Sequence, residues 1–187
     1  MLKFDFEGAR GLFHDRKYTQ MQVDSINALF AEANKQHITS KAQMAYILAT
    51  VYHECYNPKT PETRMTPIVE FGSESYLRSK KYYPYVGRGF VQLTWKENYL
   101  KYNKEIEERF GVNIMQNPEL VLRIDISAYI AIAGMKYGRF TGKCLNDYIN
   151  VKKADTYNAR RIINGLDKAQ LIADYCKQMY NYVVFVP

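Results

Sequence analysis

The sequence predicts a mainly α-helical fold with a small β element near its middle. Apolar residues recur at helical spacing in several long segments, whereas residues 87–94 are bounded by glycine and carry β-favouring side chains. The 187 residues are enough to bury a hydrophobic core and too few for two ordinary domains to be the default expectation. We therefore expect one domain over residues 1–187.

Two helices are expected in the first third of the chain. Over about residues 20–36, a series of apolar residues forms one face of a helix, namely Val23, Ile26, Leu29, Phe30 and Ala33. A second helix is expected to begin at Ser40, whose hydroxyl caps it, and Gln43 three residues later completes a capping box. Its apolar residues continue at helical spacing as far as Cys55.

The middle of the chain is expected to hold a long loop and then the β element. Prolines interrupt residues 56–86, and proline lacks the amide hydrogen that a helix interior needs, so this stretch is predicted to be mostly loop. Residues 87–94 are predicted to form a short strand because Phe90, Val91 and Leu93 favour strands. A solvated helix is then expected over residues 95–110, where Gly111 ends it.

The last third is again expected to be helical. Residues 124–137 are apolar nearly all round, which is typical of a buried central helix. A further helix is expected to end at Asn164 and Gly165, and a last one to run from residue 167 to about residue 182.

Composition and charge restrict the classes of protein that fit. With 47% hydrophobic and 24% charged residues, the chain lacks the composition of a disordered protein. We expect no signal peptide and no membrane span, because no basic start precedes an apolar stretch and no apolar run approaches the roughly 20 residues that a span requires. The net charge of +7 favours a polyanionic partner. No zinc-finger, basic-zipper or RNA-binding pattern accompanies it, so nucleic acid is not expected to be that partner.

Glu54 is the first candidate for chemistry because of its place on the second helix. At about 100° per residue it lies near Ile47 and Val51 on the apolar side, so its carboxyl group is expected at the edge of the core. Partial burial penalises the charged form of a carboxyl group, which helps a general acid to keep its proton. By itself the position also fits a solvated residue at a helix end. The loop that follows carries two more carboxylates, Glu62 and Glu70, and cleavage of a glycosidic bond requires a pair.

Residues 85–94, with the sequence YVGRGFVQLT, resemble the signature of glycoside hydrolase family 19, and Asn98 and Tyr99 follow at that family's spacing. Other blocks are similar in the same order, namely the pair His53 and Glu54 at the end of an apolar helix, MTPIVE at residues 65–70 and IING at residues 162–165. The family comprises plant-type chitinases and bacterial or phage cell-wall hydrolases. Among these the chain is similar to the phage endolysins.

The resemblance implies a lysozyme-like fold in which a helical, two-lobed catalytic domain has a small β element beside its cleft. It implies that Glu54 is the general acid, that Glu70 is the second carboxylate and that the Thr94 hydroxyl orients a water molecule. Because the loop before the MTPIVE block is longer than usual in this family, Glu62 remains a competitor for the base.

The residues that the resemblance assigns to substrate binding are His53, Tyr85, Arg88, Gln92, Asn98 and Asn164. Gln92 and Thr94 alternate along the expected strand and would share a face, although ordinary strand polarity explains them equally well. Asn164, before a glycine, fits either an acetamido contact or helix C-terminal chemistry. Arg88 fits either a partner for a cleft carboxylate or a structural role.

Neither a metal, a cofactor nor a thiol mechanism is expected. His53 and Cys55 are too close on one helix to face each other as base and nucleophile. The position where a zinc protease needs its second histidine holds Asn57. With Cys144 and Cys176 the cysteines are odd in number and lack CxxC spacing, so neither a disulfide framework nor a zinc site is indicated.

The expected function is that of a phage endolysin. It would cut the β-1,4 bond between N-acetylmuramic acid and N-acetylglucosamine in peptidoglycan with inversion, as a monomer attracted to the anionic cell envelope. The resemblance implies synthesis in the host cytoplasm and release to the wall through a holin pore. The alternatives are a chitinase, a non-catalytic wall-binding protein on the same scaffold and a basic nucleic-acid-binding module.

Overall fold

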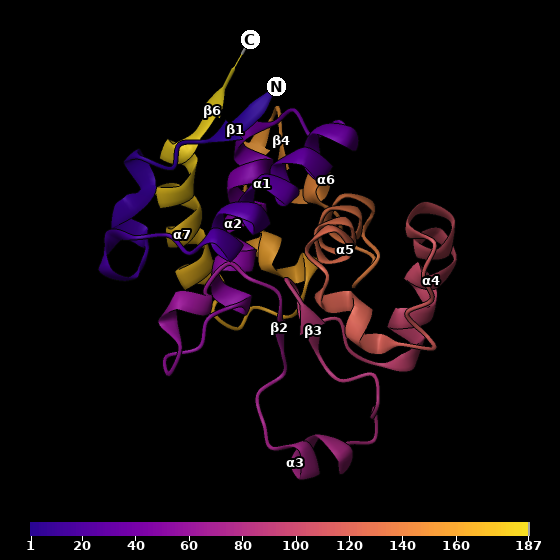
Figure 1. The fold of residues 1–187 in the computed structure, drawn as a ribbon. Coiled ribbons are helices and arrows are strands. Elements are labelled where there is room, and N and C mark those ends of the chain that lie inside the picture. Colours follow the sequence, from indigo (N-terminus) through magenta and orange to yellow (C-terminus); the bar gives the residue numbers. More distant parts are fainter. Residues whose placement is uncertain (187) are drawn as a thin grey trace.

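The computed structural model describes residues 1–186 and is mainly helical, as the sequence predicts (Figure 1). The α-helices are α1 (Gln20–Lys35), α2 (Lys41–Glu54), α3 (Glu74–Arg78), α4 (Lys96–Phe110), α5 (Ile124–Tyr137), α6 (Leu145–Tyr148) and α7 (Ala169–Tyr182). The 3₁₀ helices are η1 (Gly8–Leu12), η2 (His14–Arg16), η3 (Pro61–Thr63), η4 (Pro118–Leu122) and η5 (Asn158–Ile162). Pro187, the end of the expected domain, lies outside the described residues.

The strands form three small antiparallel pairs. They are β1 (Leu2–Phe4) with β6 (Val183–Phe185), β2 (Ile68–Val69) with β3 (Arg88–Gly89), and β4 (Ile149–Asn150) with β5 (Lys153–Ala154). The first pair joins the two ends of the described chain at one side of the molecule (Figure 1). No helix within residues 1–186 combines the length and the apolar character needed to span a bilayer.

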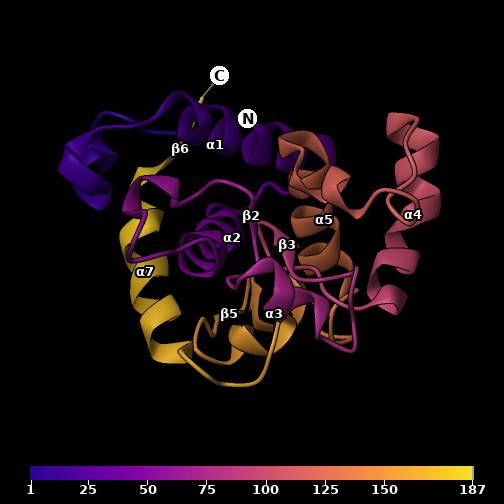
Figure 2. The same ribbon diagram turned by 60° about the horizontal axis from the view of Figure 1, so that its bottom comes forward.

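Helix α2 is the centre of the fold. Its residues from Met44 to Tyr52 are all buried, and Figure 2 shows it nearly end-on with α1, α5 and α7 around it. It packs most extensively on α7, while α1 packs on α5. Burial of each large apolar side chain contributes about 1.5–3 kcal/mol. The last turn of α2, which carries Glu54, is therefore held on a rigid element.

The expected positions of α4 and α5 are confirmed. Residues 126–135 of α5 are all buried, in keeping with its apolar sequence. Helix α4 lies at the outside of the molecule (Figures 1 and 2) and buries only one face. Gly111 and Gly138 end the two helices with φ of 68° and 70°, a conformation that glycine adopts without strain.

The expected capping box at Ser40 is only half formed. Ser40 Oγ accepts a hydrogen bond from the Gln43 amide at 3.3 Å. The Gln43 side chain donates instead to the Ile149 carbonyl at 2.7 Å, a partner that only the tertiary structure supplies. A complete capping box lies at the start of α1, between Thr19 and Gln22.

The strand expected over residues 87–94 is mostly a tight turn. Only Arg88 and Gly89 belong to β3. The chain then reverses through Gln92, which has φ of 52°, so that Arg88 and Leu93 exchange backbone hydrogen bonds of 3.2 and 2.9 Å. The apolar residues between them turn into the core rather than alternating along a strand: Phe90 is fully buried.

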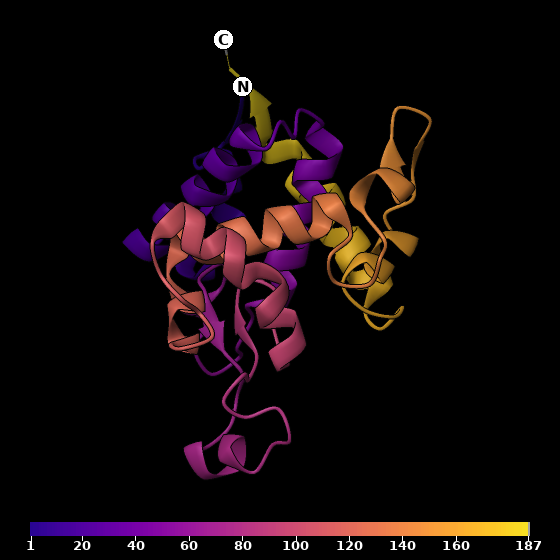
Figure 3. The same cartoon turned by 90° about the vertical axis from the view of Figure 1, so that its right-hand side faces the viewer.

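The α-helix that was expected to end at Asn164 and Gly165 is not formed. That part of the chain forms the short 3₁₀ helix η5, and α7 begins at Ala169, two residues later than expected. Residues 56–86 are mostly irregular, as predicted, with η3, β2 and α3 within them. Part of this stretch, with α3 at its tip, extends away from the body of the molecule (Figures 1 and 3).

The contact between α2 and α7 generates a stability prediction with a control on the same helix. Ile172 on α7 is fully buried, whereas its neighbour Leu171 is 39% exposed. Ile172→Ala should lower the free energy of unfolding by about 2–5 kcal/mol because it leaves a cavity, and Leu171→Ala should lower it by less than about 1 kcal/mol. Urea unfolding followed by circular dichroism measures both. Equal losses for the two variants would show that the contact is not the main stabilising interface of α7.

Candidate functional site

Glu54 is the last residue of α2, and its carboxylate binds an arginine from a distant segment. Arg160 Nη1 of η5 donates to Glu54 Oε1 at 2.6 Å, and its Nε donates to the Asp167 carbonyl at 3.0 Å. The side chains of Arg160 and Glu54 are only 4% and 16% exposed. The carboxylate is therefore held in one orientation at the edge of the core, where the helix position predicted it.

Arg160 is a functional candidate that sequence reasoning missed. Its side chain is buried although arginine is rarely found fully buried without a partner. The available signal was its place directly before the IING block at residues 162–165. The guanidinium holds the Glu54 carboxyl group in place by a charge-assisted hydrogen bond.

His53, next to Glu54, is half-buried. Burial lowers the pKa of its imidazole below the ordinary value, and the positive charges of Arg160 and Arg64 act in the same direction. The negative charges of Glu54 and Asp167 oppose this shift and do not cancel it. The ring is therefore neutral at neutral pH and can both donate and accept a hydrogen bond.

Glu70 follows β2, and both of its carboxylate oxygens accept hydrogen bonds. The Tyr82 hydroxyl donates to Oε1 at 2.6 Å, and the Gly87 amide donates to Oε2 at 3.1 Å. The Glu70 amide in turn donates to the Gly87 carbonyl at 2.7 Å. The hydrogen bond to Glu70 raises the pKa of Tyr82 to about 12, so the phenol keeps its proton and remains a donor.

Three of the predicted site residues gather around Gly87. A β-carbon at this position would lie 2.9 Å from Gln92 Oε1, 3.2 Å from Thr94 Oγ1 and 3.4 Å from the Glu70 β-carbon. The structure thus brings Glu70, Gln92 and Thr94 together, although by the tight turn and not by the strand alternation that the sequence suggested. Only glycine leaves this space open.

Gln92 and Thr94 each make a hydrogen bond within the turn. Gln92 Nε2 donates to the Ile68 carbonyl at 3.0 Å, which ties the turn to β2. Thr94 Oγ1 donates to the Gln92 carbonyl at 2.8 Å. A hydroxyl oxygen that donates in this way still has lone pairs to accept a hydrogen bond from water.

The end of α2 lies against the same turn. Cys55 Sγ lies 3.9 Å from the Gly89 carbonyl oxygen and 3.5 Å from that of Phe90, and the end of α2 is close to β2 and β3 in Figures 1 and 2. Cys55, the neighbour of Glu54, therefore contacts the turn from the end of α2, while Glu70 binds it from β2. The turn is thus the place where the segment that carries Glu54 and the segment that carries Glu70 meet.

Glu62, the competitor for the base, lies elsewhere. It is exposed on η3 and lines a cavity of ≈ 270 Å³ together with residues of η2 and the start of α1. In the described residues it forms no hydrogen bond with Gly87 or with its neighbours in the turn. Of the two loop carboxylates, Glu70 is the one that the turn binds.

Of the two roles that the sequence left open for Arg88, the contacts of its side chain favour the structural one. Its side chain is 6% exposed, and Nη2 binds Glu119 Oε1 at 2.5 Å. Nη1 donates to the carbonyl oxygens of Pro84 and Val86 at 2.8 and 3.2 Å. Arg88 therefore ties the turn to η4 and to the preceding loop, which is the structural interpretation of this residue.

The other predicted binding residues make mostly local contacts. The Tyr85 hydroxyl donates to the Met115 carbonyl at 3.3 Å. Asn98 Nδ2 donates to the Thr94 carbonyl at 2.8 Å, which links α4 to the turn. Asn164 is exposed, and its Oδ1 accepts a hydrogen bond from the Gly165 amide at 2.8 Å.

Tyr82 and Trp95 form an aromatic surface beside Glu70. Their ring centroids are 5.0 Å apart in an edge-to-face arrangement, and Trp95 is 48% exposed. Only the tertiary structure shows that Tyr82 binds Glu70. An exposed indole next to a carboxylate provides a face on which a sugar ring can stack.

The thiols of Cys55 and Cys176 are buried. Burial raises the pKa of Cys55 well above the ordinary value, and the charge of Glu54 adds to this shift. Burial also raises the pKa of Cys176 to about 12. Since the thiolate is the nucleophile, this geometry agrees with the expectation that Cys55 and His53 are not a catalytic pair.

This arrangement predicts the reactivity of the three cysteines toward a thiol reagent. In the native protein at pH 8, dithionitrobenzoate should modify half-buried Cys144 first, and Cys55 and Cys176 should react only after denaturation. Absorbance at increasing urea concentration measures the number of modified thiols. Cys144→Ser should remove the fast phase, and a fast phase that persists in this variant would contradict the burial of the other two.

Comparisons with known proteins place this geometry on a known fold. No protein-family model matches the chain, and no curated protein matches it. Among solved structures, the chain is similar to chitinase C from Streptomyces griseus HUT6037, with a TM-score of 0.55 and 20% sequence identity over 95% of this chain and 74% of that chain. It is also similar to a mutant of chitinase C, with a TM-score of 0.54 and 21% identity over 95% of this chain and 89% of the other.

At this level of identity the likeness concerns the arrangement of the chain in space. It extends over 95% of this chain. The mainly helical fold with small antiparallel strands is therefore the fold of these chitinases.

Proposed function

We propose that the protein is a glycoside hydrolase that cuts polymers of N-acetylated amino sugars. The observation that carries this proposal is the pair of fixed carboxylates, Glu54 bound by Arg160 and Glu70 bound by Tyr82 and Gly87, on two segments that meet at the turn of residues 87–94. Two carboxyl groups with different partners are what glycosidic cleavage uses, one as acid and the other as base. The fold shared with two chitinases supports the same reaction class.

In the proposed mechanism, Glu54 donates a proton to the glycosidic oxygen. Arg160 occupies Oε1, so the proton is carried by Oε2, to which the described residues make no hydrogen bond. As the bond to the leaving sugar breaks, the oxygen of a water molecule attacks the anomeric carbon from the opposite face. Glu70 takes the proton of that water, and Thr94 helps to orient it, so the anomeric configuration is inverted.

The environment of Glu70 suits a base. Its two oxygens accept hydrogen bonds from a phenol and an amide, so the carboxylate is held in one orientation. Both donors are uncharged, so this orientation is fixed without a cation bound to the carboxylate.

Peptidoglycan is the proposed substrate, cut between N-acetylmuramic acid and N-acetylglucosamine by a phage endolysin. The net charge of +7 favours a glycan that carries carboxylates and lies in an anionic envelope. In this proposal the enzyme is made in the host cytoplasm, acts as a monomer and reaches the wall after a holin opens the membrane. Chitin is the second candidate, and the similarity to chitinases favours it.

Product analysis tests the reaction and the substrate together. Purified protein is incubated with peptidoglycan and with chitin, and the released sugars are identified by mass spectrometry and by proton NMR of the first products. We expect N-acetylmuramic acid at the new reducing ends, initially as the α-anomer because inversion acts on a β-bond. New ends from chitin alone would make the protein a chitinase, and no new ends from either polymer would contradict a hydrolase.

The carboxylates are tested by three isosteric variants. Glu54→Gln keeps the shape and removes the transferable proton, so the hydrolysis rate should fall by about 10²–10⁴-fold. Glu70→Gln should be similarly impaired because water must then attack unaided. Glu62→Gln is the matched control on exposed η3 and should keep most of the activity. A damaged Glu62→Gln beside an active Glu70→Gln would move the base to Glu62, and a fully active Glu54→Gln with a native circular dichroism spectrum would contradict the mechanism.

A further inference from the structure

Arg64, which follows η3, lies against two aromatic rings near the end of α2. Its guanidinium carbon is 3.9 Å from the centroid of the Tyr52 ring and 3.8 Å from that of Tyr56. Its Nε atom is buried and has no hydrogen-bond partner. Stacking on two rings uses the faces of the planar guanidinium, so the N–H groups at its edge remain for an anion.

No carboxylate of the described residues pairs with Arg64, which sets it apart from the buried arginines. Arg88 binds Glu119 and Arg160 binds Glu54, each at 2.6 Å or less. Taking a charge partly out of water is costly unless it is paired, and ring contacts offset only a part of that cost. Arg64 is therefore a half-buried cation that pairs with no carboxylate of residues 1–186.

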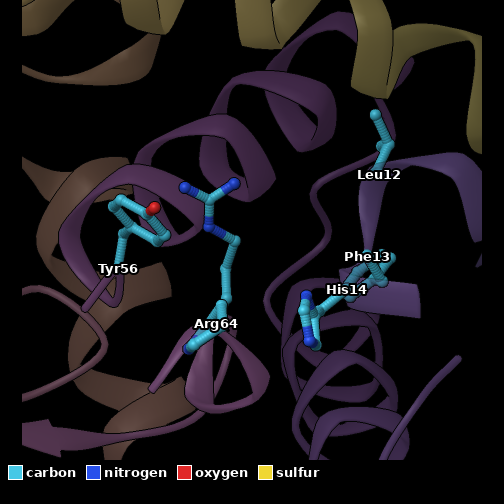
Figure 4. Close-up of a pocket in the computed structure, with 6 residues that line it drawn as sticks. Leu12, Phe13, His14, Tyr56 and Arg64 are labelled. Atoms are coloured by element: carbon cyan, nitrogen blue, oxygen red, sulfur yellow. The ribbon is translucent and has the colours of Figure 1, made fainter. Parts of the chain in front are cut away.

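The space for such a partner is a cavity of ≈ 240 Å³. It is lined by residues from three segments of the chain, namely Leu12, Phe13, His14, Tyr56, Pro61 and Arg64. Figure 4 shows the Arg64 guanidinium between Tyr56 on one side and Leu12 and His14 on the other. Asp15 is a carboxylate nearby, but it lies 3.5 Å from His14 and forms no ion pair with Arg64.

The cavity is next to the proposed proton donor. Tyr56 is two residues beyond Glu54, and the positive charge of Arg64 is one of the causes that lower the pKa of His53. The end of α2 therefore carries both the proposed proton donor and two of the rings, Tyr52 and Tyr56, that hold Arg64.

We propose that this cavity binds the carboxylate of the lactyl-peptide substituent on N-acetylmuramic acid, with the Arg64 guanidinium as its main partner. The inference rests on the proposed function and deepens it, because chitin carries no such carboxylate. An arginine whose faces are already held by Tyr52 and Tyr56 is pre-organised, so it binds the anion with little further loss of side-chain freedom. Arg64 thus contributes selectivity for peptidoglycan over uncharged glycans.

A binding experiment that needs no catalysis tests this site. Muramyl dipeptide and its fully amidated analogue, which differ only in charge, are titrated into the full chain and followed by NMR chemical shifts. Muramyl dipeptide should bind about tenfold more tightly than the amidated form. Arg64→Gln should abolish this preference, and Arg64→Lys should keep part of it because lysine retains the charge without the bidentate fork.

Lys152→Gln removes one positive charge from an exposed turn between β4 and β5 and is the matched control, with the preference expected to be unchanged. Circular dichroism and thermal melting show whether each variant is folded. If the unmutated chain binds the two ligands equally, if it binds neither, or if folded Arg64→Gln keeps the preference, the inference is wrong.

Different results would contradict the proposed function and the proposed role of Arg64. A hydrolase whose selectivity does not depend on Arg64 would leave the proposed function intact. A chain that binds muramyl dipeptide through Arg64 but does not cut peptidoglycan would be a wall-binding protein. For an active enzyme, Arg64→Gln should also lower kcat/KM about tenfold on peptidoglycan and leave the value on chitin oligosaccharides unchanged.

Discussion

The ion pair between Glu54 and Arg160 is the interaction on which the candidate site depends. It joins the last residue of the central helix α2 to η5, more than a hundred residues later in the chain. Both side chains are largely buried, so removing either partner would leave an uncompensated charge in the core. Such a pair is weak as a source of stability but strong as a constraint on geometry, because only one arrangement satisfies both groups.

The two candidate catalytic carboxylates, Glu54 and Glu70, lie in different environments. Glu54 has a cation at one oxygen and a half-buried setting, whereas Glu70 has two uncharged donors. The turn at residues 87–94, which contacts Glu70 and the end of α2, needs glycine at position 87 because Gln92, Thr94 and Glu70 all approach it. The buried Arg88 side chain in turn binds this loop to η4, so residues that do not face substrate hold those that do.

The aromatic residues around the site form two groups with different partners. Tyr82 combines a hydrogen bond to Glu70 with an edge-to-face contact to exposed Trp95, and so connects the base with a surface suited to sugar rings. Near the end of α2, Tyr52 and Tyr56 hold the guanidinium of Arg64. The first aromatic group is thus uncharged, whereas the second holds a cation. In our proposal the second group binds the carboxylate-bearing sugar of the glycan.

The sequence by itself determined the parts of this protein that depend on local periodicity and on single residues. The long helices α1, α2, α4 and α5 follow from apolar spacing, and Gly111 ends α4 because glycine adopts a positive φ at little cost. The helical position of Glu54 placed its carboxyl group at the edge of the core.

Tertiary structure decided the rest, because it depends on partners far away in the chain. The Gln43 side chain donates its hydrogen bond to the carbonyl of Ile149 and does not complete the capping box. Residues 87–94 form a turn because the chain reverses at Gln92. Arg160 binds Glu54 and Arg88 binds Glu119, whereas Arg64 pairs with no carboxylate of residues 1–186. The spacing of residues in the sequence does not determine which charged side chains form an ion pair, because ion pairs form only after packing has brought the segments together.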